Sequence, residues 1–167
     1  MRKAILQLVV IAAVQVGFAA ALSTPARALA GYEPGTIVIK TSERKLYYVL
    51  NNGQSRVYPV AVGRPGKTWT GATTIEGKFI RPAWSPPAEV RRDKPNIPSV
   101  IPGGTPENPM GAAAITLSGG GEYAIHGTNA PNSIGRSASY GCIRMHNDDI
   151  MDLYQRVNIG TPVIVMK

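Results

Sequence analysis

The chain has 167 residues, a formal net charge of +8 and 44% hydrophobic residues. This length suits one domain with a single core, and no nucleic-acid-binding motif accompanies the scattered basic residues. The composition therefore argues against several domains and against a nucleic-acid partner. It leaves open a plain solvated surface or attraction to an anionic cell envelope or a carboxylate-bearing substrate.

The first thirty residues are typical of a secretory signal peptide. Two basic residues precede an apolar stretch over residues 4–22, and Ala28 to Ala30 supply an A-x-A cleavage signal. We therefore predict a signal peptide over residues 1–30 and a periplasmic domain over residues 31–167, with no stable membrane anchor after cleavage. An uncleaved anchor is the alternative, because the apolar stretch is long enough to span a bilayer.

The segment that follows predicts an antiparallel β-meander. Ile37 to Ile39 and Leu46 to Leu50 are runs of β-branched and aromatic residues. Asn52-Gly53 between the second and third strands indicates a type I′ hairpin, whose two central residues both need positive φ. We predict the third strand over Arg56 to Val62.

Long loops rich in proline and glycine are expected over residues 63–111. Nine of the fourteen prolines lie there, and only a short strand around Lys78 to Ile80 is predicted to interrupt the loops. Trp84 and Ile101 provide apolar anchors, so we expect ordered loops that line a cleft, with disorder as the alternative.

The C-terminal part predicts two strands, a helix and a last strand. The strands cover residues 112–118 and 122–127, so His126 stands at a strand end. The helix covers residues 147–157, with Asn147 as its N-cap and apolar residues at helical spacing. With the last strand at residues 163–167, the fold class is mostly β with one main helix.

The single cysteine, Cys142, lies in a loop rich in glycine and serine, and the two histidines flank it in sequence. A cysteine nucleophile needs a base or an electropositive setting, and His126 is the candidate base. A buried structural cysteine is the alternative. Zinc on Cys142, His126 and His146 is disfavoured, because the chain lacks a second cysteine and an H-E-x-x-H motif. We therefore expect no metal and no cofactor.

Two motifs resemble the signature of the YkuD-type L,D-transpeptidases of bacterial cell walls, in particular the ErfK-like branch. The signature is His-Gly-Thr, a loop, then Ser-His-Gly-Cys-hydrophobic-Arg, and residues 126–128 and 139–144 match it. Residues 62–79 and the proline-rich stretches up to Gly111 resemble the family upstream. Tyr140 departs from the pattern, because the family usually has histidine there, and Thr74 departs from an upstream Thr-Pro-x-Gly turn.

The resemblance implies a β-sandwich-like catalytic domain that works through a thioester. Cys142 would attack the diaminopimelate carbonyl of a tetrapeptide stem, D-Ala would leave, and an amine acceptor would resolve the acyl-enzyme. His126 would be the general base, oriented by the carbonyl of Gly127. Backbone N–H groups of Tyr140, Gly141 and Cys142 would form the oxyanion hole, where one lost donor can reduce the rate about a hundredfold or more.

The resemblance also implies substrate contacts and partners. It places Arg144, Ser139 and Thr128 near the substrate; Arg144 suits a carboxylate, with a structural ion pair as its alternative. Ser139 has the alternative role of holding the loop through hydrogen bonds. The partners would be peptidoglycan stem peptides, or an envelope lipoprotein or outer-membrane protein as acceptor. Two other functions stay open: an L,D-carboxypeptidase, and a silent peptidoglycan-binding module in which Tyr140 marks decay.

Overall fold

A computed structural model of the protein describes residues 26, 27, 29, 31–119 and 123–167. The predicted signal peptide lies almost entirely outside the described residues. Within the described part, no helix combines the length and the apolar character needed to cross a membrane.

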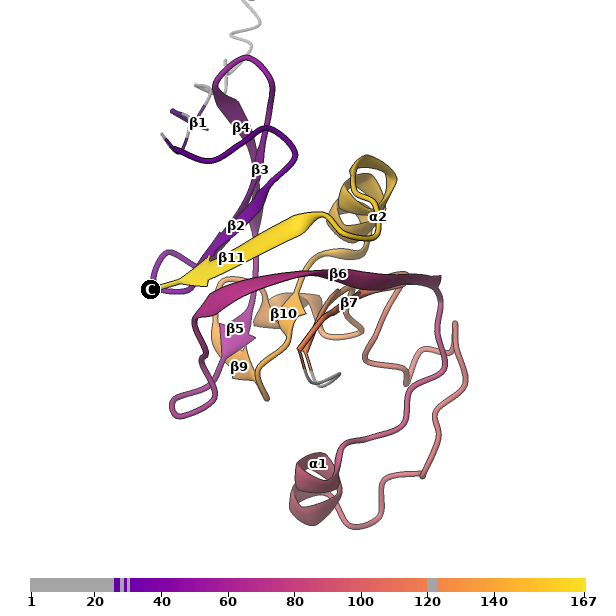
Figure 1. Ribbon diagram of the computed structural model, residues 1–167. Coiled ribbons are helices and arrows are strands. Elements are labelled where there is room, and N and C mark those ends of the chain that lie inside the picture. Colours follow the sequence, from indigo (N-terminus) through magenta and orange to yellow (C-terminus); the bar gives the residue numbers. More distant parts are fainter. Residues whose placement is uncertain (1–25, 28, 30, 120–122) are drawn as a thin grey trace, which may run out of the picture.

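Most of the domain is one curled sheet of nine strands, in the order β1-β4-β3-β2-β11-β6-β7-β8-β10 (Figure 1). A second sheet contains two strands, β5 and β9. The mostly β fold with one main helix is therefore as predicted. The strands are β1 Ala26–Arg27, β2 Ile37–Lys40, β3 Lys45–Val49, β4 Gln54–Pro59, β5 Val62–Gly63, β6 Gly71–Ile80, β7 Ala113–Leu117, β8 Ala124–His126, β9 Ser137–Ser139, β10 Ile143–Arg144 and β11 Pro162–Met166.

Strand β6 makes the sheet curl. Its first half pairs with β11 and its second half with β7, and the register shifts between Ile75 and Gly77. A bulge of this kind bends a strand and increases its twist. The strand predicted at Lys78 to Ile80 is therefore only the end of a ten-residue strand that connects the two halves of the sheet.

The main core lies between the two halves of the curled sheet and helix α2, Asn147–Arg156, which packs on β7 and β8. Ile37 and Ile39 point into this core, whereas Val38 points to a smaller cluster on the opposite face. This follows from the two-residue period of a strand. Helix α2 buries Ile150 and Leu153, as its predicted spacing requires.

The β2–β3–β4 meander is antiparallel, as predicted, but its second turn differs from the expected type I′ hairpin. Only Gly53 has positive φ there, and the N–H of Gly53 donates to the carbonyl of Leu50 at 3.3 Å. These features are typical of a three-residue loop with glycine at its last position. The predicted third strand also ends early, at Pro59, because Val62 pairs with β9 instead.

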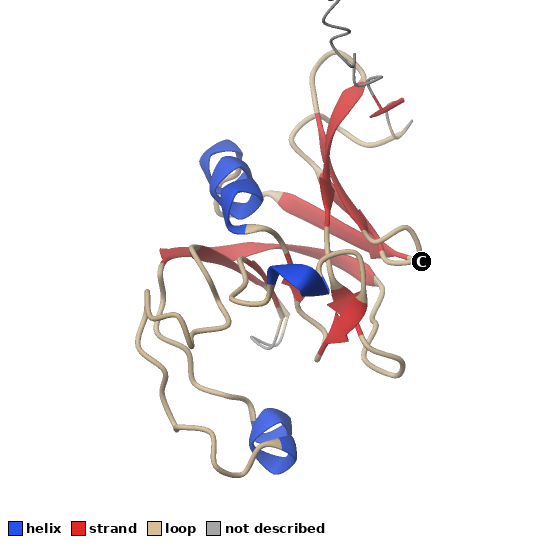
Figure 2. Cartoon of the chain, turned by 180° about the vertical axis from the view of Figure 1, so that it is seen from behind, coloured by secondary structure: helices blue, strands red, loops and turns tan. Residues whose placement is uncertain are grey.

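A long excursion over residues 81–112 separates β6 from β7, and both views show helix α1 at its far end (Figures 1 and 2). Helix α1, Ala88–Asp93, was not predicted, because six residues are too few to show a helical period. The loops are ordered, as expected: Trp84 and Ile101 exchange two backbone hydrogen bonds of 2.8 and 2.9 Å. A single 3-10 turn, Pro131–Ser133, follows β8.

Candidate active site

Strand register places the candidate catalytic residues on one face. Strands β8 and β10 are parallel, with Ile125 opposite Ile143 and His126 opposite Arg144. Because side chains alternate between faces, His126 and Arg144 share a face, and Cys142, two residues before Arg144, continues it. Ile125 and Ile143 point the other way, into the main core. The core thus fixes which face carries the polar side chains.

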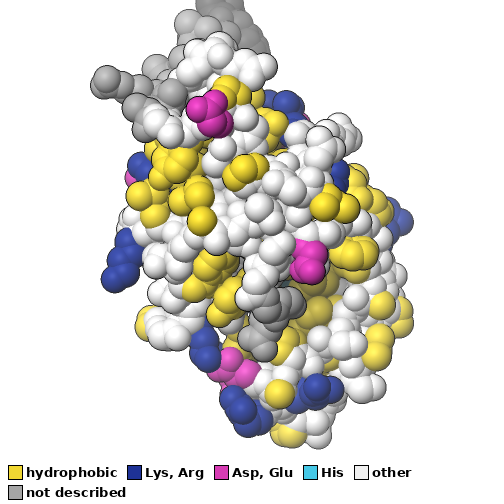
Figure 3. All heavy atoms as spheres, viewed as in Figure 1, with side chains coloured by type: hydrophobic (Ala, Val, Ile, Leu, Met, Phe, Trp, Pro, Cys, Tyr) yellow, Lys and Arg dark blue, Asp and Glu magenta, His cyan; other side chains and the backbone are white. Residues whose placement is uncertain are grey.

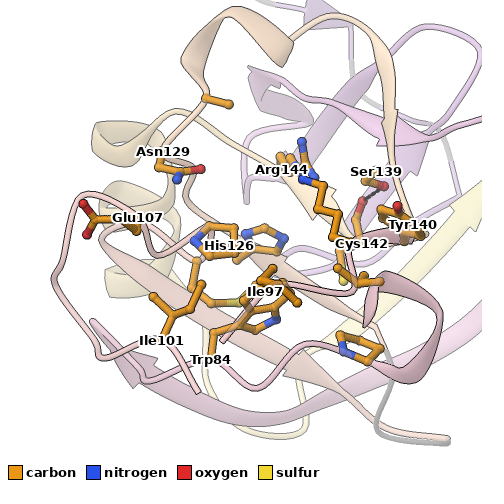
Figure 4. Close-up of a pocket in the computed structure, with 16 residues that line it drawn as sticks. Trp84, Ile97, Ile101, Glu107, His126, Asn129, Ser139, Tyr140, Cys142 and Arg144 are labelled. Atoms are coloured by element: carbon orange, nitrogen blue, oxygen red, sulfur yellow. Dashed lines mark hydrogen bonds between the residues drawn. The ribbon is translucent and has the colours of Figure 1, made fainter. Parts of the chain in front are cut away.

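The shared face opens into a cavity of about 260 Å³. Cys142, His126 and Arg144 all line it, and Figure 4 shows Trp84 and Ile101 on the opposite side of His126 from Arg144. The excursion supplies much of the remaining wall. The lining residues are Trp84, Pro87, Val90, Lys94, Ile97, Ile101, Glu107, Pro109, Met110, His126, Asn129, Ala130, Ser139, Tyr140, Cys142 and Arg144.

The ring of His126 is buried, and a backbone carbonyl orients its Nδ1. Its Nδ1 lies 2.7 Å from the carbonyl oxygen of Gly127. A carbonyl only accepts hydrogen bonds, so in the neutral ring Nδ1 carries the proton and Nε2 keeps its lone pair. Burial, with the positive charge of Arg144, lowers the pKa of His126 to about 4, and backbone carbonyls of Gly127 and Pro109 oppose this. The imidazole is therefore neutral at pH 7.

The thiol of Cys142 is also neutral in this setting. Burial raises its pKa above the ordinary value of 9.0, although a backbone hydrogen bond with Ala124 and the charge of Arg144 act in the opposite direction. A neutral thiol and a neutral imidazole can react only if the proton moves when an electrophile arrives. The positive charge of Arg144 disfavours an imidazolium and favours a thiolate. It therefore supports the loss of the proton from Cys142, and not its gain by His126.

The loop before Cys142 is held by hydrogen bonds on both sides. Ser139 Oγ donates to the carbonyl of Cys142 at 2.6 Å and accepts from the N–H of Gly141 at 3.0 Å. The indole of Trp69 donates to the carbonyl of Gly141 at 3.1 Å. Trp69 also stacks on Tyr123, whose ring would lie 2.4 Å from a Cβ at position 141. Together with φ of +126°, this contact requires glycine there.

Arg144 brings a positive charge into the cavity. Its side chain is partly buried, and burial lowers its pKa. Among the described residues no ion pair includes Arg144, and its buried Nε has no hydrogen-bond partner. The alternative of a structural ion pair therefore finds no carboxylate in the described part of the chain. A guanidinium in this setting suits an anionic ligand.

Asn147 was predicted to be the N-cap of α2, and this prediction is wrong. His146 occupies that position, without a side-chain cap. The amide of Asn147 instead joins the segment before β7 to the segment after β8. Its Oδ1 accepts from the N–H groups of Ala112 and Thr128, both at 3.0 Å, and its Nδ2 donates to the carbonyl of Thr128 at 3.1 Å. The segment thus held is the one that orients His126. Only the tertiary contact between residues distant in sequence reveals this role.

Two other predicted residues lie outside the cavity of Cys142. Thr128 is buried and lines a neighbouring cavity of about 570 Å³, and its Oγ1 accepts from the N–H of Ala130 at 3.0 Å. His146 precedes α2 and does not line the cavity. The described residues contain no cluster of three or more histidine, cysteine, aspartate or glutamate side chains that could hold a metal ion.

A further cavity, of about 430 Å³, reaches Cys142 from another side. Phe79 and Tyr123 line this second cavity only, whereas Trp84, Pro87 and Met110 line both cavities at Cys142. Cys142 therefore borders both cavities. Both cavities have mostly apolar side chains in their walls.

Fold and site together define a mostly β domain with a cysteine and a histidine on one face of two parallel strands. The family model YkuD, described as the L,D-transpeptidase catalytic domain, matches residues 34–165. The chain therefore belongs to the YkuD family of L,D-transpeptidase catalytic domains.

Curated relatives and solved structures agree. The chain is 40% identical to the probable L,D-transpeptidase ErfK/SrfK of Escherichia coli over 78% of the chain and 43% of the relative, so it spans less than half of that protein. It is 35% identical to the putative L,D-transpeptidase YqjB of Bacillus subtilis, covering 77% and 69%. L,D-transpeptidase 3 of Mycobacterium tuberculosis, in complex with a faropenem-derived adduct, shares the fold with a TM-score of 0.61 at 20% identity, covering 79% and 60%.

Proposed function

We propose that the domain is a peptidoglycan L,D-transpeptidase with Cys142 as its nucleophile. One observation carries the proposal: the β8–β10 register puts Cys142, His126 and Arg144 on one face of a shared cavity. Family membership supplies the reaction class. The donor is the tetrapeptide stem of peptidoglycan.

The reaction begins when Nε2 of His126 takes the thiol proton of Cys142 as the sulfur attacks the diaminopimelate carbonyl. The Gly127 carbonyl holds the ring in the required tautomer. Backbone N–H groups of Tyr140 and Cys142 stabilise the oxyanion. The N–H of Gly141, which was also expected to do so, donates to Ser139 Oγ instead, so Gly141 anchors the loop. The imidazolium then protonates the leaving amine of D-Ala, and a thioester remains.

The second half of the reaction transfers the acyl group. An acceptor amine attacks the thioester and gives a proton to His126, which passes it to the departing sulfur, so the thiol of Cys142 and the neutral imidazole are regenerated. Two cavities meet at the sulfur, which favours a second substrate over hydrolysis by water alone. The acceptor is the side-chain amine of another stem, or an envelope lipoprotein or outer-membrane protein. A carboxypeptidase would use the same acyl-enzyme and differ only in this step.

Arg144 provides the anion-binding group for a stem carboxylate, since it brings a guanidinium to the cavity beside the nucleophile. Ser139 supports substrate binding through the loop that it holds, and Thr128 does so through the segment that carries His126. The signal peptide predicted over residues 1–30 would place the enzyme in the periplasm, where these substrates occur.

The decisive experiment incubates the domain from Gly31 with purified disaccharide-tetrapeptide and analyses the products by mass spectrometry. We expect a crosslinked dimer that has lost one D-Ala, and no product from the Cys142→Ala variant, which should keep its fold. Tripeptide alone would indicate hydrolysis or a missing protein acceptor. Unchanged tetrapeptide, with no carbapenem adduct on Cys142, would favour the silent binding module.

A further inference from the structure

Helix α1 forms one side of the cavity that contains Cys142. Pro87, Val90 and Lys94 line the cavity from this helix and its two ends. Figure 2 shows α1 at the tip of the long excursion, apart from the sheet. Val90 is its one buried side chain, so apolar packing contributes little to holding the helix in place. The position of this wall must therefore depend on other contacts.

A polar network joins α1 to the loop of the nucleophile. Asp93 accepts a hydrogen bond of 2.6 Å from the hydroxyl of Tyr140 and pairs with Arg64 at 3.1 Å. The guanidinium of Arg64 lies over the Tyr140 ring, 3.9 Å from its centre. One turn earlier, Glu89 pairs with Lys67 at 2.7 Å and with Arg64 at 3.4 Å. Toward the lower end of Figure 3, basic and acidic side chains lie next to one another.

The body of the domain holds its half of this network firmly. The N–H of Arg64 donates to the carbonyl of Ser139 at 2.9 Å, and the N–H of Lys67 donates to the carbonyl of Arg64 at 2.8 Å. Tyr140 itself lies between Ser139 and Gly141, which are hydrogen-bonded to each other. Backbone hydrogen bonds thus fix the partners on the side of the nucleophile, whereas α1 is joined to them through side chains.

We infer that Tyr140 is a positioning residue: its hydroxyl, through Asp93, holds helix α1 as the wall of the Cys142 cavity and so sets the size of group that reaches the sulfur. The inference rests on the proposed function only in taking this cavity as the active site. The residue that departs from the usual family histidine then has a role of its own. It couples this wall of the cavity to the loop that carries the nucleophile.

The hydroxyl matters because the surrounding ion pairs are exposed. Side chains of Arg64 and Asp93 are 38% and 41% exposed, and exposed pairs are screened by solvent and contribute little each. Tyr140 adds a short hydrogen bond to a carboxylate and a ring on which Arg64 rests. Hydrogen bonds to charged groups are stronger than neutral ones. Removing this one group should loosen α1 without disturbing the core.

The test compares a bulky maleimide with iodoacetamide as reagents for Cys142. In Tyr140→Phe and in Asp93→Ala, we expect the ratio of the two rate constants to rise about two- to fivefold, the effect of losing one exposed charged contact. Amide hydrogen exchange over residues 88–94 should accelerate in both variants, with exchange in β7 unchanged. Tyr48→Phe is the matched control, since its hydroxyl donates to the Arg156 carbonyl at 3.1 Å, outside both cavities at Cys142.

A ratio equal to that of the wild type in both variants would overturn the inference. So would a change in Asp93→Ala alone, because ion pairs and not the tyrosine would then hold the wall. High salt, which screens exposed ion pairs, should change the ratio little in the wild-type protein, because the contact that holds the wall is the hydrogen bond of the Tyr140 hydroxyl. These readouts need no turnover. If the wild-type domain fails to process tetrapeptide while the ratios change as expected, the proposed function fails and the role of Tyr140 stands.

Discussion

At the scale of single residues, the chemistry depends on the burial of His126 and Cys142 and on the backbone groups that contact them. Burial holds both the His126 imidazole and the Cys142 thiol in their neutral forms. The Gly127 carbonyl then decides which nitrogen of His126 can accept a proton. The charge of Arg144 acts on both groups in the direction that favours a thiolate.

The reactivity of Cys142 should follow a raised pKa. We expect its rate of alkylation by iodoacetamide to keep rising from pH 7 to pH 9, by nearly tenfold per unit, because only the thiolate reacts. Arg144→Gln should slow the reaction further at each pH, since it removes the charge that favours the thiolate. A plateau already present at pH 7 would contradict this and would indicate a preformed thiolate–imidazolium pair.

Trp69 should affect acylation but not alkylation. Trp69→Phe keeps the stack on Tyr123 and removes the hydrogen bond to the Gly141 carbonyl. A lost hydrogen bond of about 1 kcal/mol corresponds to a roughly fivefold slower acylation of Cys142 by a carbapenem. Iodoacetamide serves as the control reagent, because its reaction forms no oxyanion. If the rates of acylation and alkylation fell equally, Trp69 would have no specific role in positioning the loop before Cys142 for the oxyanion.

At the scale of elements, helix α2 does more than cover the sheet. Its first residue, Asn147, binds the ends of the segments that precede β7 and follow β8. A Cβ at Gly111 would lie 2.2 Å from Asn147 Oδ1, and a Cβ at Gly127 would lie 2.3 Å from it. These contacts explain why both positions are glycine. The helix also binds β4, since Asp152 pairs with Arg56 at 2.6 Å and accepts a hydrogen bond from Tyr58.

Asn147→Ala should therefore destabilise the domain. The substitution leaves two N–H groups and one carbonyl without their partner, and we expect the free energy of unfolding to fall by about 1–3 kcal/mol in urea titrations. Asn147→Asp should lose less, because it keeps the acceptor and removes only the donor to Thr128. The control is Asp148→Ala, the next position of the same turn, which is also exposed. If Asn147→Ala and Asp148→Ala lowered the free energy of unfolding equally, the hydrogen bonds of Asn147 would not be what stabilises the domain here.

At the scale of the whole molecule, stability should depend on the protonation of His126. Its pKa is about 4 in the folded protein, against 6.5 as the ordinary value, so the unfolded chain binds the proton more readily. The free energy of unfolding is then highest above pH 6.5 and decreases as the pH falls toward 4. From pH 7.5 to pH 5 the loss from this group is about 2 kcal/mol.

Thermal or urea unfolding between pH 5 and pH 7.5 measures this loss. His126→Gln should flatten the slope in that window, because glutamine does not titrate. His146→Gln is the matched control, because it removes the other histidine, which lies outside the cavity. An unchanged slope in His126→Gln would show that the buried histidine is not the group responsible.

Sequence patterns predicted what depends on neighbours along the chain: the antiparallel meander, helix α2 and the motifs around His126 and Cys142. The strands and the helix show a periodicity over a few residues, and the motifs are contiguous, so all of them can be recognised in the sequence before the fold is known. The prediction of a type I′ turn at Asn52-Gly53 was wrong. The length of the loop selects the type of turn, and the dipeptide alone does not. Helix α1 escaped detection for the opposite reason, since its short sequence has no period to read.

The sequence alone determined the fold class, the family and the chemical identity of the candidate nucleophile and base. Only the tertiary structure decided that Asn147 clamps the His126 segment, that Thr128 faces another cavity, and that Tyr140 meets Asp93 on α1. The contacts of Asn147 with Thr128 and of Tyr140 with Asp93 join residues 19 and 47 positions apart in the chain. No local pattern encodes such a pairing, because the curl of the sheet and the path of the long excursion bring the partners together.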